Sequence, residues 1–271
     1  MEFYKYEAAQ NDFILVDLLK PAERNEAIME FLKKSARMLC DRRLGIGADG
    51  ILVLTSSDRS DAFMHIINSD GSIAAMCGNG IRCAARYLYK RRIPDLARPL
   101  YIDTLGGLQH VRYISGDASE FQIEVAIDHA NITGNCEIRQ NDKVWCGIQV
   151  DVGNPHAVFE TDDPDTALAE SGEFLSNHPH FPDRSNIEFI RAVGEKTLRF
   201  AVYERGAGPT PACGTGCVAA AAAYCHAHRT FGCIQIHAPG GDLCVTVPEN
   251  GADRMRLCGP ARFVFRGSLD E

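Results

Sequence analysis

The sequence lacks several features that would define a class of protein directly. Its 271 residues include 28 lysines and arginines but no basic block, and 36 aspartates and glutamates give a net charge of −8. Nucleic acids and anionic membranes attract positively charged surfaces, so neither is an expected partner. No apolar run approaches the ~18 residues that cross a bilayer, and the N-terminal stretch, with its early acidic residues, is not typical of a signal peptide. We therefore expect a cytoplasmic protein.

Cofactor motifs are missing as well. Residues 45–50, GIGADG, match G-x-G-x-x-G, but a dinucleotide fingerprint follows a strand and opens a helix. Here the charged CDRR precedes the glycines and the strand-like ILVLT follows them, so the context is reversed. There is no G-x-x-x-x-G-K-[ST] phosphate loop and no lysine in a recognisable pyridoxal-phosphate setting. A mechanism without a cofactor is therefore expected.

The eleven cysteines are an odd number spread over a long chain, unlike the disulfide framework of a small secreted protein. We expect most of them to be reduced and buried. Four of them lie in two similar motifs, MCGNGIRC at 76–83 and ACGTGC at 212–217, whose first cysteines are 136 residues apart, half the chain length. Strand-like segments lie before and after each motif. This arrangement favours an internal duplication that gives two similar α+β domains.

Residue patterns predict the main elements. Apolar positions with helical spacing predict a helix within residues 24–43 that Gly45 ends. Two more helices are expected at the cysteine motifs, from about 80 to 92 and over 217–228. The last one, CVAAAAAYCHAH, is apolar on nearly every face, so we expect sheets wrapped around it. Strands are predicted at 51–55, 63–68, 100–104, 110–114, 121–127, 144–152, 186–193, 197–205, 233–238 and 242–247.

A cysteine followed by glycines at a helix N-terminus suits acid–base chemistry. The helix dipole and its open amides lower the pKa of such a thiol, and glycines let a carboxylate approach the amides closely. One cysteine could remove a proton beside a carboxylate while the other delivers a proton to the opposite face.

Two other interpretations stay open for these cysteines. A lone cysteine at a helix start is more often a small buried side chain. Cys213 and Cys217 also have the short spacing of structural zinc sites, whereas the spacing of Cys77 and Cys83 suits zinc poorly. The second interpretation would make the chain a non-enzymatic zinc or thiol protein.

The blocks around the motifs resemble the diaminopimelate epimerase family. They occur in the family's order: NDF at 11–13, NSDGSIAAMCGNGIRCAARY at 68–87, GNPHAVF at 153–159, SNIEFI at 185–190 and YERGAGPTPACGTGCVAAAAA at 203–223. The resemblance implies an α+β fold of two pseudo-symmetric domains, each a β-sheet folded around a central helix. The expected domains are residues 1–120, completed by the C-terminal strand 261–271, and residues 121–260, with the active site in the cleft between them.

The resemblance also implies an activity and its residues. The family's reaction is the cofactor-independent interconversion of LL- and meso-2,6-diaminopimelate, in lysine and peptidoglycan precursor synthesis, with Cys77 and Cys213 as the acid/base pair. His156 and Glu204 would tune the pKa of these cysteines. The implied substrate-binding residues are Asn11, Asn68, Gly78, Asn79, Asn154, Asn186, Glu204, Arg205, Gly214 and Thr215. No metal site is implied; the expected partners are the small-molecule substrate and, in a homodimer, a second copy of the chain. A racemase of another amino acid in the same fold family is the nearest alternative.

The chain departs from the family pattern at two positions. Gln10 precedes Asn11 where small, glycine-rich residues are expected, and a glutamine does not readily take a positive φ. The shape of this loop and its closure over substrate are therefore open. Gly50 stands where some members carry a glutamine that reaches the substrate, so we expect that contact to be absent.

Overall fold

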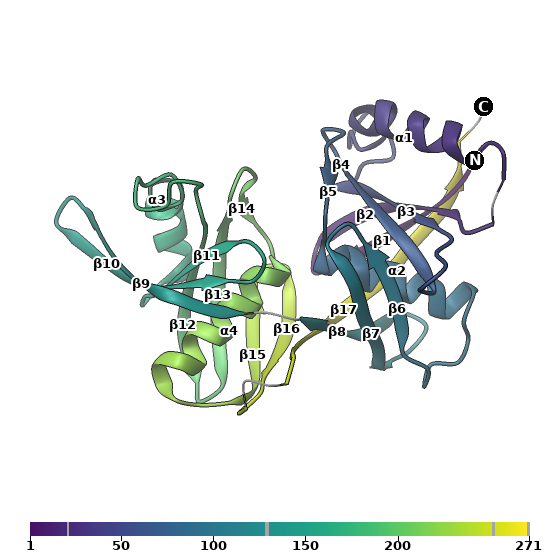
Figure 1. Cartoon of the computed structure of the whole chain (residues 1–271). Coiled ribbons are helices and arrows are strands. Elements are labelled where there is room, and N and C mark those ends of the chain that lie inside the picture. Colours follow the sequence, from purple (N-terminus) through teal and green to yellow (C-terminus); the bar gives the residue numbers. More distant parts are fainter. Residues whose placement is uncertain (21, 128–129, 251–252, 270–271) are drawn as a thin grey trace. The chain divides into compact units, whose positions relative to one another are not determined.

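The structure, a computed structural model, describes residues 1–20, 22–127, 130–250 and 253–269. The chain divides into two units. Unit 1 consists of Met1–Val125 together with the C-terminal segment that begins at Gly259, and unit 2 is Ala126–Cys258. Each unit contains two helices and its own set of strands, and β17 pairs with strands of both sets (Figure 1).

Unit 1 is a sheet that closes around one helix. Its strands pair in the order β17-β1-β2-β3-β4-β6-β7-β8, and β8 pairs with β17 again, with α2 inside (Figure 1). Most neighbours are antiparallel, but β2–β3 and β4–β6 are parallel. The elements are β1 (Glu2–Ala8), β2 (Asn11–Leu18), α1 (Asn25–Leu39), β3 (Gly50–Thr55), β4 (Ala62–Asn68), β5 (Ile73–Ala74), α2 (Gly78–Arg91), β6 (Leu100–Thr104), β7 (Gly107–Gly116), β8 (Glu120–Ile127) and β17 (Met255–Ser268).

Unit 2 repeats this order of elements. Its strands pair in the order β9-β10-β11-β12-β13-β15-β16, and the first residues of β17 pair with β16. The elements are β9 (Asn131–Gln140), β10 (Lys143–Asp151), β11 (Pro155–Glu160), α3 (Pro164–Ser176), β12 (Asn186–Gly194), β13 (Thr197–Glu204), β14 (Gly208–Thr210), α4 (Gly214–His228), β15 (Gly232–Ala238) and β16 (Gly241–Val247).

The two units correspond element by element. In unit 1 the parallel pairs are β2–β3, joined through α1, and β4–β6, joined through α2. In unit 2 they are β11–β12, joined through α3, and β13–β15, joined through α4. Since a parallel pair needs a crossover connection, each helix sits where the topology requires it. The predicted α+β fold of two pseudo-symmetric sheets, each with a central helix, is confirmed.

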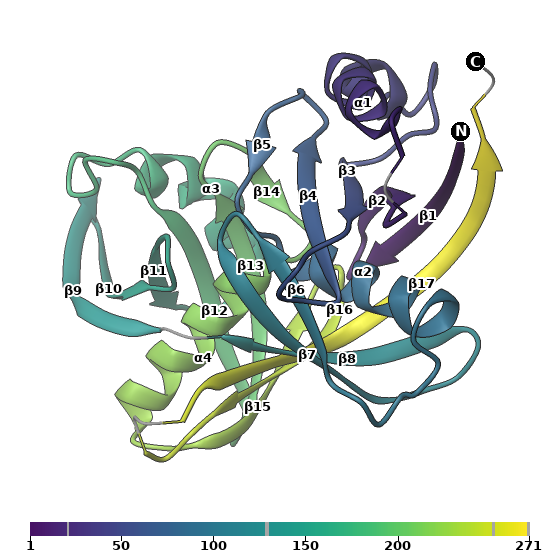
Figure 2. The same ribbon diagram turned by 45° about the vertical axis from the view of Figure 1, so that its right-hand side comes forward.

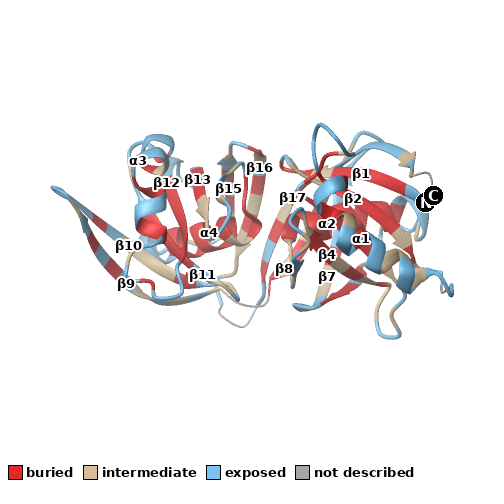
Figure 3. Ribbon diagram, turned by 90° about the horizontal axis from the view of Figure 1, so that it is seen from above, coloured by how far each residue is buried: buried red, intermediate tan, exposed pale blue. Residues whose placement is uncertain are grey.

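The alanine-rich helix α4 is the core of unit 2. Residues 219–223 are all alanine, and none is more than 8% exposed. The helix contacts β9, β10, β11, β12 and β16, and Figure 3 shows the buried colour along it. Small side chains on every face let strands approach a helix from all sides. The expectation of sheets around this helix is therefore correct.

The central helix of unit 1 carries two buried arginines instead. Arg82 and Arg86 are 0% and 2% exposed. The Nε of Arg82 donates to the carbonyl oxygen of Pro260 at 3.2 Å, and Arg86 donates to the carbonyl oxygens of Ser119 and Ala261. Buried charges need such partners. The bonds to Pro260 and Ala261 join the C-terminal strand β17 to α2; both elements are labelled in Figure 2.

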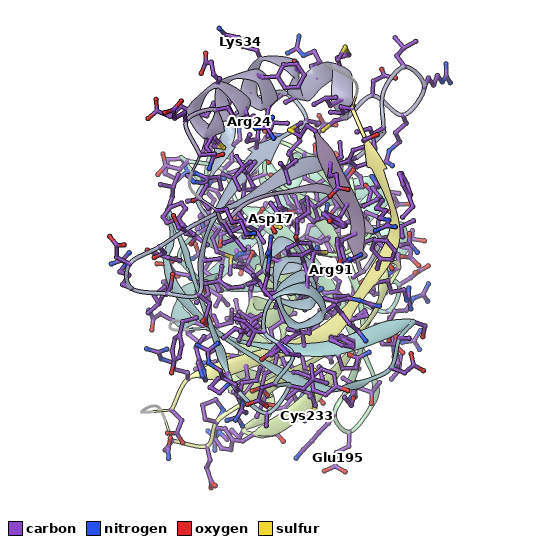
Figure 4. The ribbon with its side chains drawn as sticks, turned by 90° about the vertical axis from the view of Figure 1, so that its right-hand side faces the viewer. Asp17, Arg24, Lys34, Arg91, Glu195 and Cys233 are labelled. Carbon is purple, nitrogen blue, oxygen red and sulfur yellow. A yellow bond between two sulfur atoms is a disulfide. The ribbon has the colours of Figure 1, made fainter. Side chains whose placement is uncertain are left out.

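The helix predicted within residues 24–43 is α1, and its apolar residues do not all face the core. Leu32, Ala36 and Leu39 are buried, whereas Phe31 and Met38 are exposed. The outer side of the helix is charged, as Lys34 shows (Figure 4). The buried side of α1 packs against residues of β2, β3 and β4, including Val16, Val53 and Ile67.

Several elements were not predicted. They are β1, β2, β5, β9, β11, β14 and helix α3, whereas β17 overlaps the expected C-terminal strand at 261–271 but begins earlier. Helix α3 begins with Pro164 at its first turn and has Gly172 in its interior. Its amphipathic pattern is weak, which explains why the sequence did not indicate it. No helix among the described residues is long and apolar enough to cross a bilayer.

The cysteines are mostly reduced, with one exception. Cys233 on β15 and Cys244 on β16 form a disulfide, with Cα atoms 6.2 Å apart; Cys233 is labelled in Figure 4. This pair was not expected. The cysteines that are reduced and buried, as predicted, include Cys40, Cys83, Cys136, Cys213 and Cys225.

Candidate active site

Each cysteine motif places its first cysteine at the N-cap of a central helix. Cys77 is the N-cap of α2 and Cys213 is the N-cap of α4, both with extended backbone. The sulfur of Cys77 accepts a hydrogen bond from the N–H of Gly80 at 3.4 Å, and that of Cys213 accepts one from Gly216 at 3.4 Å. An oxygen usually fills this role. Both helices therefore begin earlier than predicted, directly after the cysteine.

The capping geometry leaves the remaining first-turn amides for other acceptors. Gly78 and Asn79 open α2, while Gly214 and Thr215 open α4. First-turn N–H groups have no intrahelical partner, and the helix dipole adds partial positive charge at this end. Each motif thus presents a sulfur beside amides that favour an anion.

Three predicted residues of unit 1 lie together. The Oδ1 of Asn11 is 3.8 Å from the sulfur of Cys77 and accepts a hydrogen bond of 3.2 Å from the Nδ2 of Asn79. The Nδ2 of Asn11 in turn donates to the carboxylate of Asp49 at 2.8 Å. Asn11 is therefore held at both ends of its amide, with its oxygen toward the cysteine.

Asp49 and its neighbours were missed in the sequence. Arg42 donates to Asp12 at 2.7 Å and to Asp49 at 2.8 Å, and Lys5 pairs with Asp12 at 2.6 Å. Burial raises the pKa of Asp12, but the hydrogen bonds from Arg42 and Lys5 outweigh it and lower that pKa to about 2. This charged cluster fixes the start of β2 and so positions Asn11. No local spacing links these residues.

The turn before Asn11 has positive φ at Gln10, although glutamine does not readily adopt it. Ala9 and Gln10 both have positive φ, 53° and 62°. They form the two-residue connection of a hairpin in which Ala8 pairs with Asn11, and such turns require positive φ at both positions. The N–H of Gln10 donates to Glu7 at 3.1 Å. Strand pairing and this bond thus hold a glutamine where glycine would be easier.

Asn68 and Gly50 lie at the same end of the sheet as the start of β2. Asn68 ends β4 and pairs with Gly50 at the start of β3, and Gly50 pairs with Phe13. The Nδ2 of Asn68 donates to the hydroxyl of Ser72 at 2.9 Å. A Cβ at Gly50 would lie 2.8 Å from the carbonyl oxygen of Ile67. This backbone leaves no room for a side chain at position 50.

Cys213 is held as a thiol. Burial raises its pKa well above the ordinary value, and the carboxylates of Glu204 and Glu188 raise it further. Hydrogen bonds from Thr215 and from the amide of Gly216 lower it, but less. The expectation that the helix start lowers the pKa of this cysteine is therefore wrong, because desolvation outweighs the helix end.

His156 lies in a buried chain of hydrogen bonds. Its Nδ1 is 2.7 Å from the Oε1 of Glu188, and its Nε2 is 3.0 Å from the Oδ1 of Asn154. His156 and Glu188 are both buried. Glu204, the other residue expected to tune the cysteines, is among the groups that raise the pKa of Cys213, and it accepts a hydrogen bond from the hydroxyl of Thr210.

Glu188 was not among the predicted site residues, although its position in the sequence indicates a special role. It is a carboxylate between Ile187 and Phe189 in a strand whose first five residues are all buried. A buried acid in an apolar strand indicates a special role.

Asn186 and Arg205 are linked to each other. The Nδ2 of Asn186 donates to the carbonyl oxygen of Pro155 at 2.9 Å, and its Oδ1 accepts from the N–H of Arg205 at 3.0 Å. Asn186 is buried, so it holds the loop after β13 in place. The side chain of Arg205 is exposed, and its Nη1 donates to the carbonyl oxygen of Asp183 at 3.0 Å. Its guanidinium therefore stays accessible.

The cysteine pairs do not form a metal centre within the described residues. No group of three or more histidine, cysteine, aspartate or glutamate side chains lies close enough there to hold a metal ion. Cys83 and Cys217 are both fully buried inside their helices. Burial raises the pKa of the Cys83 thiol, which disfavours the thiolate that a metal needs.

Two matching α+β units, each with a cysteine-capped central helix, make up a fold that also occurs in solved structures of other proteins. A PhzF-family protein from Bacillus anthracis superposes with a TM-score of 0.75 over 100% of this chain and 99% of its own, at 15% identity. A hydroxyproline epimerase from Agrobacterium vitis gives a TM-score of 0.71 over 99% of this chain and 90% of its own, at 14% identity. At these identities the likeness concerns the fold.

Sequence relatives are more informative. Residues 3–132 and 148–264 match the profile of diaminopimelate epimerase. The diaminopimelate epimerases of Desulfitobacterium hafniense and Moorella thermoacetica are each 37% identical, over 100% and 99% of this chain and 99% of their own lengths. The chain belongs to the diaminopimelate epimerase family, and it is an isomerase.

Proposed function

We propose that the chain interconverts LL- and meso-2,6-diaminopimelate without a cofactor, and that Cys77 and Cys213 transfer the protons. One observation carries the mechanism. Each sulfur caps one of two equivalent central helices and accepts a hydrogen bond of the same length from the glycine amide three residues on. The names of the relatives support the substrate.

In the proposed mechanism Cys213 begins as the thiol, which the raised pKa of this buried group supports. Cys77 begins as the thiolate and removes the α-proton of the substrate. The electron pair of the broken C–H bond delocalises into the adjacent carboxylate, and the amides at the helix N-termini stabilise the added charge. Cys213 then gives its proton to the opposite face of the carbon. The cycle leaves Cys77 as thiol and Cys213 as thiolate, from which the reverse reaction starts.

Diaminopimelate has an ammonium and a carboxylate group at each end. Neutral asparagine side chains offer donors and acceptors to both, and we assign this role to Asn11, Asn68, Asn154 and Asn186. Arg205 binds the carboxylate distant from the reacting carbon, and Glu204 binds an ammonium group.

We also propose a cytoplasmic location, in lysine and peptidoglycan precursor synthesis, and a homodimer. Phe263, Val264 and Phe265 of β17 are 38%, 50% and 42% exposed, an apolar group suited to contact with a second copy. Sedimentation velocity of the wild type and of Val264→Glu tests the dimer. Dissociation of a wild-type dimer by this substitution supports it, and a wild-type monomer contradicts it.

Incorporation of solvent deuterium tests the activity. The purified protein is incubated in D₂O with LL-diaminopimelate and, separately, with proline, hydroxyproline, glutamate and other amino acids. We expect deuterium at the α-carbon of diaminopimelate together with formation of the meso isomer. Exchange only into another amino acid would indicate a racemase of that amino acid. No exchange, together with stoichiometric zinc that is lost on replacing Cys213 or Cys217, would indicate a zinc protein.

A further inference from the structure

Glu188 lies beneath the first turn of α4, inside unit 2. Its side chain and that of His156 are fully buried. The Oε1 of Glu188 is so close to Gly216 that a Cβ there would lie 2.8 Å from it. The parallel pairing of β11 with β12 sets His156 beside Asn186 and Val158 beside Glu188, which brings the imidazole and the carboxyl group to one another.

The partners of His156 restrict where its protons can be. Nδ1 faces a carboxyl oxygen of Glu188, and Nε2 faces the amide oxygen of Asn154. An amide oxygen only accepts hydrogen bonds, so Nε2 must carry a proton. Nδ1 then either accepts a proton from a neutral Glu188 or donates one to an ionised Glu188. Both arrangements hold the same number of protons, and both leave the pair without net charge.

The surroundings of Glu188 disfavour loss of the shared proton. Within the described part of the chain, the Oε2 of Glu188 has no hydrogen-bond partner. Burying a carboxylate that has one oxygen without a hydrogen-bond partner costs free energy, and burying the neutral acid costs less. Burial accordingly raises the pKa of Glu188.

We propose that Glu188 is a positioning residue that acts through His156 to fix the orientation of the Asn154 amide. Because Nε2 donates to the oxygen of Asn154, the Nδ2 group must point away from His156. That group has no hydrogen-bond partner among the described residues, and Asn154 is partly exposed. Its two N–H donors are therefore presented to a carboxylate of the substrate. This inference rests on the proposed role of Asn154 in binding.

Loss of Glu188 would release this arrangement. Without a carboxyl group at Nδ1 the imidazole loses its anchor, both tautomers become accessible, and the amide of Asn154 can turn its oxygen toward the substrate. An oxygen facing a carboxylate binds it poorly. At neutral pH the effect should appear mainly in substrate binding, since the fully buried Glu188 is argued to act through His156 and Asn154.

Long-range ¹H–¹⁵N NMR of the intact protein, with ¹⁵N-labelled histidine, reads the tautomer directly. The His156 signals are assigned by their absence in His156→Gln. We expect a protonated Nε2 in the wild type and in Glu188→Gln, whose amide can donate to Nδ1. A bare Nε2 in the wild type would overturn the proposal. This readout does not depend on catalysis, so it stands or falls separately from the two-cysteine mechanism.

Steady-state kinetics on diaminopimelate supply the second test. In folded Glu188→Leu, we expect KM to rise about three- to tenfold, the cost of ordering one released side chain, with kcat changed less than about twofold. Glu188→Gln should stay within about twofold of the wild type in both constants. Asp103→Asn is the control. It changes another buried acid, which lies in unit 1 and pairs with Arg59, and it should leave KM unchanged. An unchanged KM in Glu188→Leu, or a change confined to the pH profile of kcat, would contradict the proposal.

Discussion

The backbone N–H of Gly216 donates a hydrogen bond of 3.4 Å to the sulfur of Cys213. Gly216 has no room for a side chain, because a Cβ there would lie 2.8 Å from the Oε1 of Glu188. At the equivalent Gly80, a Cβ would lie 3.1 Å from Cδ2 of Leu52, the end of a flexible side chain. Similar caps in the two units therefore differ in how tightly they are packed.

This difference predicts that alanine at Gly216 and alanine at Gly80 change the free energy of unfolding by different amounts. Gly216→Ala should lower the free energy of unfolding by about 1–3 kcal/mol, the usual cost of overpacking. Gly80→Ala should change it by less than about 1 kcal/mol, since the Leu52 side chain can move and alanine favours a helix. Urea denaturation of both variants measures the effect. Equal losses would show that the contact with Glu188 is not the cause.

Replacing either capping cysteine with alanine should abolish epimerisation. Each variant lacks the proton carrier for one face, so we expect a loss of more than about 100-fold in rate, the lower range for general acid–base catalysis. Folding is checked by circular dichroism. Cys146→Ala removes an exposed cysteine and should remain active. Either Cys77→Ala or Cys213→Ala with more than about a hundredth of wild-type activity would contradict the mechanism.

Arg205→Ala should weaken substrate binding far more than it affects folding. Loss of one half of a charged contact costs about 2–5 kcal/mol of binding, whereas an exposed side chain contributes within about 0.5 kcal/mol to stability. Arg191→Ala is the matched control, because this exposed arginine also donates to one backbone carbonyl, that of Asp162, at 2.9 Å. Kinetics and urea denaturation of both variants are compared. Similar KM values for Arg205→Ala and the wild type would refute this role.

The pH dependence of kcat should report the thiol of Cys213. This thiol is needed as the acid in one direction, and its pKa lies well above the ordinary 9.0. Activity in that direction should therefore persist through pH 9 and be lost at higher pH, where the proton is gone. Glu204→Gln removes a carboxylate that raises this pKa, so the alkaline loss should move to lower pH. Glu160→Gln, at an exposed acid paired with His228, should leave the profile unchanged.

Gln10→Gly should stabilise the protein. Gln10 has a φ of 62°, a conformation that costs an L-residue about 1–2 kcal/mol and glycine nothing. After the greater entropy of an unfolded glycine is subtracted, the expected gain is about 0.5–1 kcal/mol. Gln122→Gly, in the regular strand β8, should have the opposite sign. A loss of stability in Gln10→Gly would mean that the contacts of the glutamine outweigh the strain.

Much of the fold was determined by the sequence itself. The alanine run of α4 is apolar on every side, and only a helix inside a sheet can bury such a surface. The repeated cysteine–glycine motif at half the chain length indicated two similar domains, and the pairing of strands repeats between the units. The positions of the capping cysteines follow from the same short motifs, because a cap depends on residues within one turn.

Only the tertiary structure decided how the polar groups of the site meet. Asn11 lies far from Asp49 in the sequence, and His156 lies far from Glu188. Strand register creates these contacts, and a local pattern shows which face is buried but not which group it faces. The pKa of Cys213 also depends on the tertiary structure. Burial raises this pKa by more than the hydrogen bonds at the helix start lower it. The positive φ of Gln10 was likewise imposed by strand pairing against its local preference.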